Sequence, residues 1–187
     1  MSRLIETIRI ENGIPGNIEY HFRRMGTLAW DKNKLLEIDL PKDGVYKLRV
    51  VYDINHFEHT ISRYTIRHIR SLKLVTDNDI VYDHKFEDRS ILDRLLSYKD
   101  DCDDILIIKR NFITDVSFAN IIFKKGDQWY TPDSFLLNGT MRQKLLDTGR
   151  IREKKIRVDN LGDFTHFKPI NAMLRDDAPE SEILNIR

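Results

Sequence analysis

Residues 103–132 read DDILIIKRNFITDVSFANIIFKKGDQWYTP, a stretch in which apolar runs are separated by short polar segments. Three runs rich in β-branched and aromatic residues, DILIIK, ITDVSFANIIFK and QWYT, are separated by RN at 110–111 and by KKGD at 124–127. Short polar or glycine-containing turns between such runs are typical of β-hairpins. The stretch therefore predicts consecutive strands joined by hairpin turns.

Helical patterns flank this strand-rich stretch on both sides. Before it, a stripe of apolar residues at helical spacing runs up to Tyr98 and is followed by the acidic run KDDCDD; the stripe consists of Ile91, Leu92, Leu95 and Leu96. After it, residues 140–148 predict a helix that Gly149 terminates. The run IREKKIRV at 151–158 then predicts one more strand.

The N-terminal part of the chain predicts a second sheet with one helix. Residues 3–10, RLIETIRI, alternate like a strand and end at the turn cluster ENGIPG. Asn17 is suited to cap a helix whose apolar residues are Ile18, Phe22, Met25 and Leu28. Three further runs predict an antiparallel meander: VYKLRVVYD at 45–53, HFEHTISRYTIR at 56–67 and IRSLKLV at 69–75.

These elements together predict an α+β protein. A chain of 187 residues can form one large domain or two small domains that share an interface. We place a boundary near TDNDI, with a small N-terminal α/β sheet domain at 1–78 and a larger sheet-rich domain at 79–187.

Composition narrows the function classes. The 31 basic and 30 acidic residues nearly cancel, so no net charge attracts nucleic acid or an anionic membrane. The single cysteine, Cys102, excludes an internal disulfide and a multi-cysteine metal site. Because the N-terminus lacks an apolar signal region and no apolar run reaches about 20 residues, a cytoplasmic location is expected.

Single motifs favour no chemistry by themselves. In HFEH, His56 and His59 would face opposite sides of a strand, which argues against a shared metal ion. There is no GxSxG, no phosphate loop and no paired-cysteine zinc motif. The basic run from Arg63 to Arg70 leaves an RNA-binding strand as one alternative, although arginines that alternate on an exposed strand face are the commoner explanation.

Four segments in order carry a resemblance to a known family. They are IETIRIENGIPGNIEYHFRRM (5–25), YDHKFEDRSILDRLL (82–96), the opening stretch at 103–132, and LLNGTMRQKLLDTG (136–149). The chain resembles the fold type IV pyridoxal-phosphate (PLP) enzymes. These are the class IV aminotransferases, which include branched-chain and D-amino-acid aminotransferases and aminodeoxychorismate lyase. The resemblance implies a two-domain fold type IV PLP enzyme.

The resemblance implies roles for three side chains. Lys85 matches the lysine that forms a Schiff base with the cofactor and then acts as general base and acid. Asp115 stands where the family usually has a glutamate that keeps the pyridine nitrogen protonated, so this sequence departs by one methylene. Arg24, in the family's His-x-x-Arg pattern, matches an arginine that binds the cofactor phosphate.

Two turns match the rest of the phosphate site. The first consists of Gly139, Thr140 and Met141, where Thr140 replaces an aliphatic residue and equally suits a helix N-cap. The second consists of Asn171 and Ala172 in PINAM.

The resemblance implies an aminotransferase that acts on an amino acid. A PLP lyase similar to aminodeoxychorismate lyase is the alternative, because Arg89 follows Lys85 by four positions as in the lyases. A degenerate, non-catalytic member of the fold is a further alternative, which Asp115 and a chain shorter than typical members favour. Candidates for binding the substrate carboxylate are Lys47 and Arg49, although charges on an exposed sheet face are the commoner explanation for both residues. Family members are usually homodimers, and the same is expected here.

Overall fold

The computed structural model describes residues 2–26, 32–174 and 178–187. The chain forms two compact units, of which the first comprises Met1–Ile66 and His84–Asp88 and the second Arg67–Asp83 and Arg89–Arg187. The boundary predicted near residue 78 falls inside the second unit. Residues 84–88 of the first unit are thus inserted in the sequence of the second.

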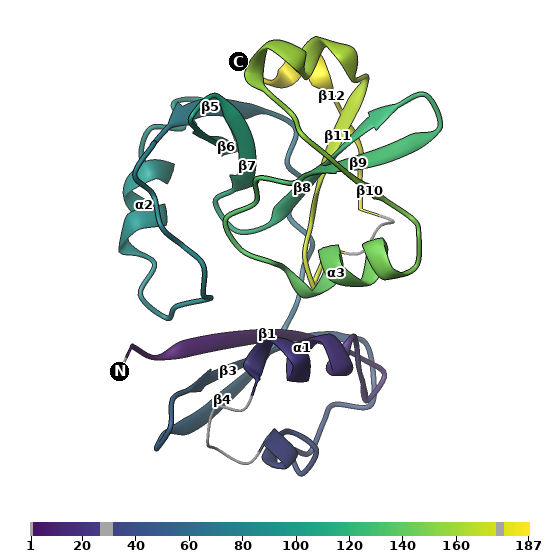
Figure 1. Cartoon of the computed structure of the whole chain (residues 1–187). Coiled ribbons are helices and arrows are strands. Elements are labelled where there is room, and N and C mark those ends of the chain that lie inside the picture. Colours follow the sequence, from purple (N-terminus) through teal and green to yellow (C-terminus); the bar gives the residue numbers. More distant parts are fainter. Residues whose placement is uncertain (1, 27–31, 175–177) are drawn as a thin grey trace. The chain divides into compact units, whose positions relative to one another are not determined.

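The first unit is an antiparallel sheet with one helix packed on it (Figure 1). Its strand order is β2-β1-β3-β4, with β1 at Leu4–Glu11, β2 at Ile14–Pro15, β3 at Val45–Tyr52 and β4 at Phe57–Arg63. Helix α1 (Ile18–Met25) follows Asn17, and a 3-10 turn covers Lys32–Leu35. Leu28, predicted to continue the helix, lies outside the described residues.

Strand alternation builds the core of this unit. Ile8 and Ile10 of β1 point to the same face as Leu48 and Val50 of β3, and all four are buried. Met25 of α1 packs into this cluster. The helix therefore covers the apolar face of the sheet, as the predicted amphipathic pattern requires.

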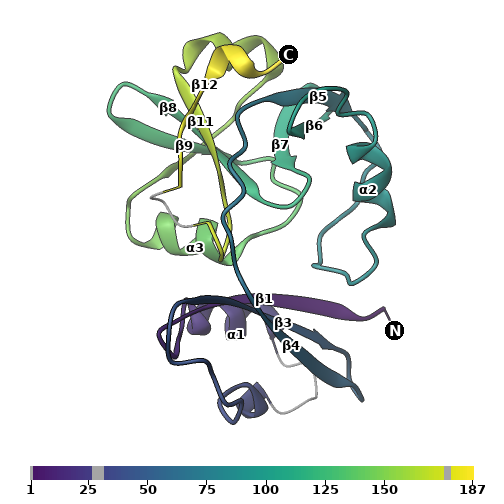
Figure 2. The ribbon, with the colours of Figure 1, turned by 180° about the vertical axis from the view of Figure 1, so that it is seen from behind.

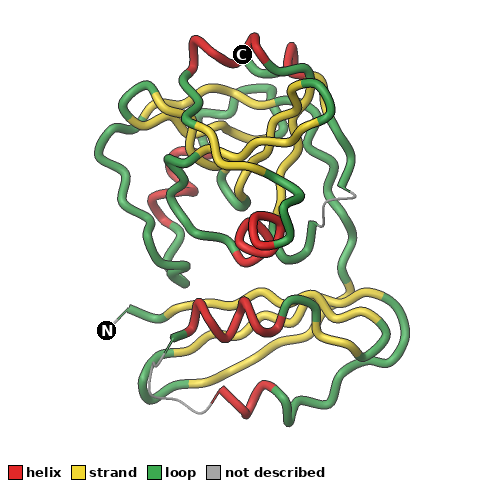
Figure 3. Tube along the Cα trace, turned by 45° about the vertical axis from the view of Figure 1, so that its right-hand side comes forward, coloured by secondary structure: helices red, strands yellow, loops and turns green. Residues whose placement is uncertain are grey.

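The second unit contains two sheets (Figures 2 and 3). The smaller sheet has the order β5-β6-β7, with β5 at Leu72–Thr76, β6 at Asp104–Lys109 and β7 at Phe112–Val116. The larger has the order β10-β9-β8-β11-β12, with β10 at Arg152–Lys154, β9 at Gln128–Pro132, β8 at Asn120–Lys125, β11 at His166–Ile170 and β12 at Ser181–Glu182. The helices are α2 (Ser90–Leu96) and α3 (Thr140–Asp147), with 3-10 turns at Val158–Asp163 and Ile183–Asn185.

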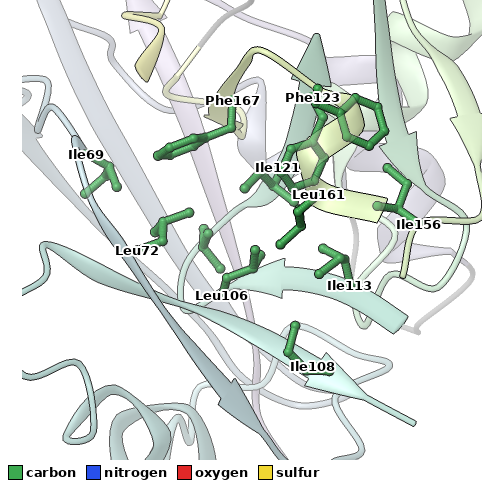
Figure 4. Packing of buried hydrophobic residues seen from close by; sticks show 12 residues of the cluster. Ile69, Leu72, Leu106, Ile108, Ile113, Ile121, Phe123, Ile156, Leu161 and Phe167 are labelled. Carbon is green, nitrogen blue, oxygen red and sulfur yellow. The ribbon is translucent and has the colours of Figure 1, made fainter. Parts of the chain in front are cut away.

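The main core of this unit lies where residues of both sheets meet (Figure 4). Leu106 and Ile113 come from the smaller sheet, and Ile121, Phe123 and Phe167 from the larger. The neighbouring residue Ile122 points to the opposite face, where it joins a second cluster with Met141 and Leu145 of α3. Because both faces of β8 are covered, its strand reads as a continuous apolar run rather than as an alternation.

Several predicted strands need correction. The run IRSLKLV does not continue the meander, because β5 pairs in parallel with β6 in the second unit. Strand β4 ends at Arg63, so the basic run up to Arg70 does not form one strand face, and Arg67 and the backbone of Arg70 instead bond to Asp103. The strand predicted at 151–158 is shortened to β10.

The run ITDVSFANIIFK also differs from the prediction, because it forms two strands in two sheets. The chain turns at residues 117–119, where the Val116 amide donates to the Ala119 carbonyl at 3.0 Å. The buried Asp104 carboxylate holds this turn by accepting hydrogen bonds from the Ser117 amide and hydroxyl. The turn places Asp115 and Asn120 on its two sides.

No helix in the described part of the chain combines the length and the apolar composition needed to span a membrane.

Candidate active site

In the first unit, the segment that carries Lys85 is fixed to the start of β1. The Lys85 carbonyl accepts a hydrogen bond from the Ile5 amide at 2.8 Å, and the Glu87 amide donates to the Arg3 carbonyl at 2.9 Å. The Lys85 side chain is half-buried. Its backbone is therefore held beside the residue that follows Ile5, which is Glu6.

Glu6 is the centre of a buried polar cluster. It lies on the same face of β1 as Ile8 and Ile10, and its side chain is 1% exposed. Arg24 of α1 donates from Nε to Glu6 Oε1 at 2.8 Å and from Nη2 to Oε2 at 2.5 Å. His21, one helical turn earlier, places Nδ1 2.5 Å from Glu6 Oε2. One carboxylate thus binds both polar residues of the His-x-x-Arg pattern.

The charge states in this cluster follow from burial and pairing. Burial acts to raise the pKa of Glu6, but the Arg24 charge and the hydrogen bonds from His21 and Arg24 outweigh it and lower the pKa to about 2. Burial lowers the pKa of His21 despite its bond to Glu6. His21 is therefore neutral, and its Nδ1–H donates to the carboxylate.

The charge of Lys85 acts on His21. The positive charge of Lys85 contributes to the lowered pKa of His21, which places the two side chains in one electrostatic environment. His21 Nε2 is buried and has no hydrogen-bond partner among the residues that the structure describes. The first unit therefore brings together Lys85 and Arg24, which were predicted, with Glu6 and His21, which were not assigned a role.

In the second unit, Asp115 at the end of β7 organises a loop. Its Oδ2 accepts hydrogen bonds from the amides of Leu136 and Leu137 at 2.9 and 3.0 Å, and its Oδ1 accepts one from Asn120 Nδ2 at 2.8 Å. Asp115 is buried, and burial raises its pKa to about 6, against the opposing effect of these hydrogen bonds. The carboxyl group is thus fixed in place and titrates close to neutral pH.

Asn120 connects Asp115 to the turn before α3. Its Nδ2 also donates to the Leu137 carbonyl at 2.8 Å. Its Oδ1 occupies the space beside Gly139, where a Cβ would stand only 2.1 Å away. Gly139 is therefore required by close packing and not by its backbone angles, which any residue adopts.

The two predicted phosphate turns lie at the same end of the larger sheet. Gly139 precedes α3, and no side chain among the described residues caps the first turn of this helix. Asn171 directly follows Ile170, which is the register partner of Asn120. The Asn171 side-chain oxygen accepts hydrogen bonds from the Met173 and Leu174 amides, both at 2.8 Å, and so closes a tight turn.

Thr140, Met141 and Ala172 are buried, as is Arg142, to which we assigned no role from sequence. Arg142 donates to Asn138 Oδ1 at 3.3 Å and to Glu153, and it stacks 4.0 Å from the Phe135 ring centroid. The start of α3 is therefore held from both sides, by Asn120 and by Arg142.

Three other residues singled out from sequence have local partners. Arg89 donates to the Ser117 carbonyl at 3.0 Å, so it supports the turn between β7 and β8. Arg49 pairs with Glu87 at 3.2 Å, next to the segment of Lys85. Lys47 lies in β3, where it is the register partner of Arg9 in β1 and of Ser62 in β4.

A cleft of about 850 Å³ lies elsewhere in the second unit, along β5 and α2. It contains the ion pairs Arg94–Asp77 at 2.9 Å and Lys73–Asp100 at 3.0 Å. None of the predicted site residues lines it. The two polar clusters around Glu6 and Asp115 are thus the stronger candidates for chemistry.

A signal for Glu6 was present in the sequence. A carboxylate at the inward position of RLIETIRI, in phase with Ile8 and Ile10, needs a buried partner, and the His-x-x-Arg pattern supplies two. No such signal identified Arg142, because its burial depends on Glu153 and Phe135 from other elements.

Comparison with known proteins points to one family. The family model described as amino-transferase class IV matches residues 52–175, well over half of the chain. An uncharacterized protein of Haemophilus influenzae is 34% identical in an alignment of 185 residues, which covers 92% of this chain and 98% of that protein.

Two solved structures share the fold over nearly their whole length. A proposed 4-amino-4-deoxychorismate lyase from Haemophilus somnus 129pt has a TM-score of 0.85 at 34% identity, over 92% of this chain and 97% of that one. A proposed amino-acid aminotransferase from Mesorhizobium loti has a TM-score of 0.84 at 20% identity, over the full length of both chains. At that identity the second likeness shows the fold alone. Both relatives therefore have about the same length as this chain.

Proposed function

The chain belongs to the class IV aminotransferase family, and from this premise we propose that it transfers the amino group of an amino acid, with Lys85 as the residue that binds the cofactor covalently. Members of the family are PLP-dependent aminotransferases or lyases, so the family, the enzyme class and the cofactor predicted from sequence are confirmed. The roles of individual residues are part of the proposal.

The side chains of each unit have the chemistry that PLP requires. The first unit offers the Lys85 amine, on a segment whose backbone is fixed beside β1, and the Arg24 guanidinium, which pairs with the buried Glu6 carboxylate. The second unit offers a buried carboxyl group, Asp115, and the start of α3 after Gly139. Helix starts bind phosphate through their amides, and arginine binds it through paired hydrogen bonds. The donor set therefore fits the cofactor.

PLP, when bound, supplies an aldehyde that binds amines and a ring that stabilises negative charge at the substrate α-carbon. Lys85 Nζ would bind the cofactor covalently and, once the substrate amine has released it, would carry the proton taken from the substrate α-carbon. Asp115 would keep the ring nitrogen protonated. The phosphate would be bound by Arg24, by the amides of Gly139, Thr140 and Met141, and by the turn at Asn171 and Ala172.

The observation that carries this proposal is the convergence of Lys85 and Arg24 on Glu6. The two residues are far apart in sequence, yet one is fixed beside Glu6 through its backbone and the other is paired with Glu6 directly. A surface lysine and a helix-face arginine would show no such convergence. Buried titratable groups with shifted pKa values, such as Glu6 and His21, are typical of a functional site.

An amine-donor screen tests the proposal. The full-length protein is purified with PLP, and absorbance is recorded on addition of a panel of D- and L-amino acids. We expect yellow protein, a spectral change with one or more donors, and formation of the corresponding keto acid. Protein that binds PLP but responds to no donor would favour the degenerate, non-catalytic member.

A lyase is the second candidate, which the likeness to the Haemophilus somnus protein favours. A protein of Schizosaccharomyces pombe, a proposed aminodeoxychorismate lyase, is also 38% identical over 64 residues. Incubation with 4-amino-4-deoxychorismate separates the two reactions. Release of pyruvate without any added keto acid would indicate elimination, whereas transamination requires an amino acceptor.

We also expect the active form to be a homodimer, as is usual in the family. Light scattering of the purified protein after size-exclusion chromatography measures the mass directly. A mass equal to the 22.2 kDa of one chain would contradict this expectation.

A further inference from the structure

We propose that Glu6 is a positioning residue for cofactor binding: its carboxylate fixes the guanidinium of Arg24 in the orientation that receives a phosphate monoester, and His21 fixes Glu6 in turn. This inference rests on the proposed role of Arg24 in binding the PLP phosphate. It assigns a role to Glu6 and His21, neither of which touches the cofactor in this scheme.

The geometry of the Arg24–Glu6 pair defines one edge of the guanidinium. The pair is side-on, because Nε and Nη2 each donate to a separate oxygen of the same carboxylate, at 2.8 and 2.5 Å. Two parallel hydrogen bonds fix both the direction and the plane of the guanidinium group. The Nη1 group takes no part in this pair.

Its burial suits Glu6 to a positioning role. The Glu6 side chain is 1% exposed and is therefore shielded from solvent. His21 is 0% exposed and donates to the same oxygen that Arg24 Nη2 binds, 2.5 Å away. The cluster therefore forms a chain in which His21 orients Glu6 and Glu6 orients Arg24.

The charges of Glu6 and Arg24 allow orientation to be distinguished from charge as the cause of phosphate binding. Glu6 is ionised and His21 is neutral, so the Glu6 charge cancels the charge of Arg24 within the cluster. If charge alone governed phosphate binding, neutralising Glu6 would strengthen the binding. If orientation governs it, neutralising Glu6 weakens the binding. The two explanations predict opposite signs.

The experiment compares PLP with pyridoxal, which lacks the phosphate. Dissociation constants of both are measured by absorbance titration for the full-length wild type and for Glu6→Gln. We expect Glu6→Gln to bind PLP about 10-fold more weakly, because the substitution removes one charge-assisted hydrogen bond to Arg24. The dissociation constant of pyridoxal should change by less than about 3-fold. Glu11→Gln is the matched control, because Glu11 lies on the same strand and pairs with Arg9 at 3.5 Å.

A second pair of variants tests the role of His21 and covers the case in which Glu6→Gln does not fold. His21→Asn keeps a donor near the Nδ1 position, whereas His21→Leu removes it. We expect His21→Leu to lower the preference for PLP over pyridoxal and His21→Asn to restore most of it. If His21 had only a structural role, His21→Leu would change the affinities for PLP and for pyridoxal by the same factor.

The outcomes separate the inference from the proposed function. A wild type that binds neither PLP nor pyridoxal contradicts the proposed function itself. A wild type that prefers PLP, together with variants whose preference for PLP is unchanged or increased, overturns the positioning role and leaves the proposed function intact.

Discussion

The Oδ1 atom of Asn120 fills the space that a side chain at Gly139 would need, 2.1 Å from the position of a Cβ. Asn120 is held there by two hydrogen bonds from its Nδ2, to Asp115 and to the Leu137 carbonyl, each 2.8 Å long. The glycine of the LLNGT turn and the asparagine of the FAN turn are thus complementary, although they belong to segments that are separate in sequence.

Gly139→Ala should destabilise the protein by about 2 kcal/mol, because Asn120 must move and leave buried polar groups unpaired. The alanine itself suits the backbone, since φ is −68° and ψ is 146° at this residue. Urea unfolding measures the change. In an Asn120→Ala background the same substitution should cost less than about 0.5 kcal/mol, and equal costs in both backgrounds would contradict the steric explanation.

Asp115→Asn should change how stability depends on pH. The pKa of Asp115 is about 6 in the folded protein and 3.8 when exposed, so the folded state binds more protons between these values. The contribution of Asp115 to the free energy of unfolding therefore falls as pH rises from about 4 to 6, by an amount on the order of 3 kcal/mol. Asparagine does not titrate, so the variant lacks this fall.

Unfolding free energies of wild type and Asp115→Asn at pH 4 and pH 7 give the measurement. We expect the wild type to lose stability relative to the variant between the two pH values. A constant difference between the two proteins would show that Asp115 titrates at its ordinary pKa.

The spacing of apolar residues within single segments predicted most of the helices and strands, because these elements depend on residues that are close in sequence. The β6–β7 hairpin formed at Arg110 and Asn111, which adopt φ values of 51° and 67°, as the polar pair indicated. The helices at 18–25 and 140–147 also lie where apolar spacing placed them. Alternation and spacing are properties of a single segment and can be read without the rest of the fold.

Pairing between segments was harder to predict. Strand β5 is apolar and follows β4, which favoured a meander, but it pairs in parallel with β6. The strands β11 and β12 were not predicted, because HFKPI contains a proline and β12 is only two residues long. The role of Asn120 was likewise hidden, because its partners lie on other elements.

Phe167→Ala tests the core that joins the two sheets of the second unit. Phe167 is fully buried in the cluster shown in Figure 4, so its truncation should cost about 3–5 kcal/mol of unfolding free energy. Leu184→Ala serves as the control, because Leu184 is 84% exposed and its truncation should change stability by less than about 0.5 kcal/mol. Similar costs for the two variants would contradict the packing described for this core.

Lys85→Ala tests the covalent role of the amine most directly. Wild-type protein loaded with PLP and treated with borohydride should carry the cofactor permanently on the peptide that contains residue 85, because reduction makes the bond to the amine irreversible. Lys85→Ala should lose this attachment and all turnover. Since the side chain is only half-buried and the segment is held through its backbone, the variant should keep its fold, which circular dichroism checks. Attachment at another lysine in the wild type would transfer the proposed role to that residue, and colour that survives both the substitution and dialysis would show that the cofactor is held without Lys85.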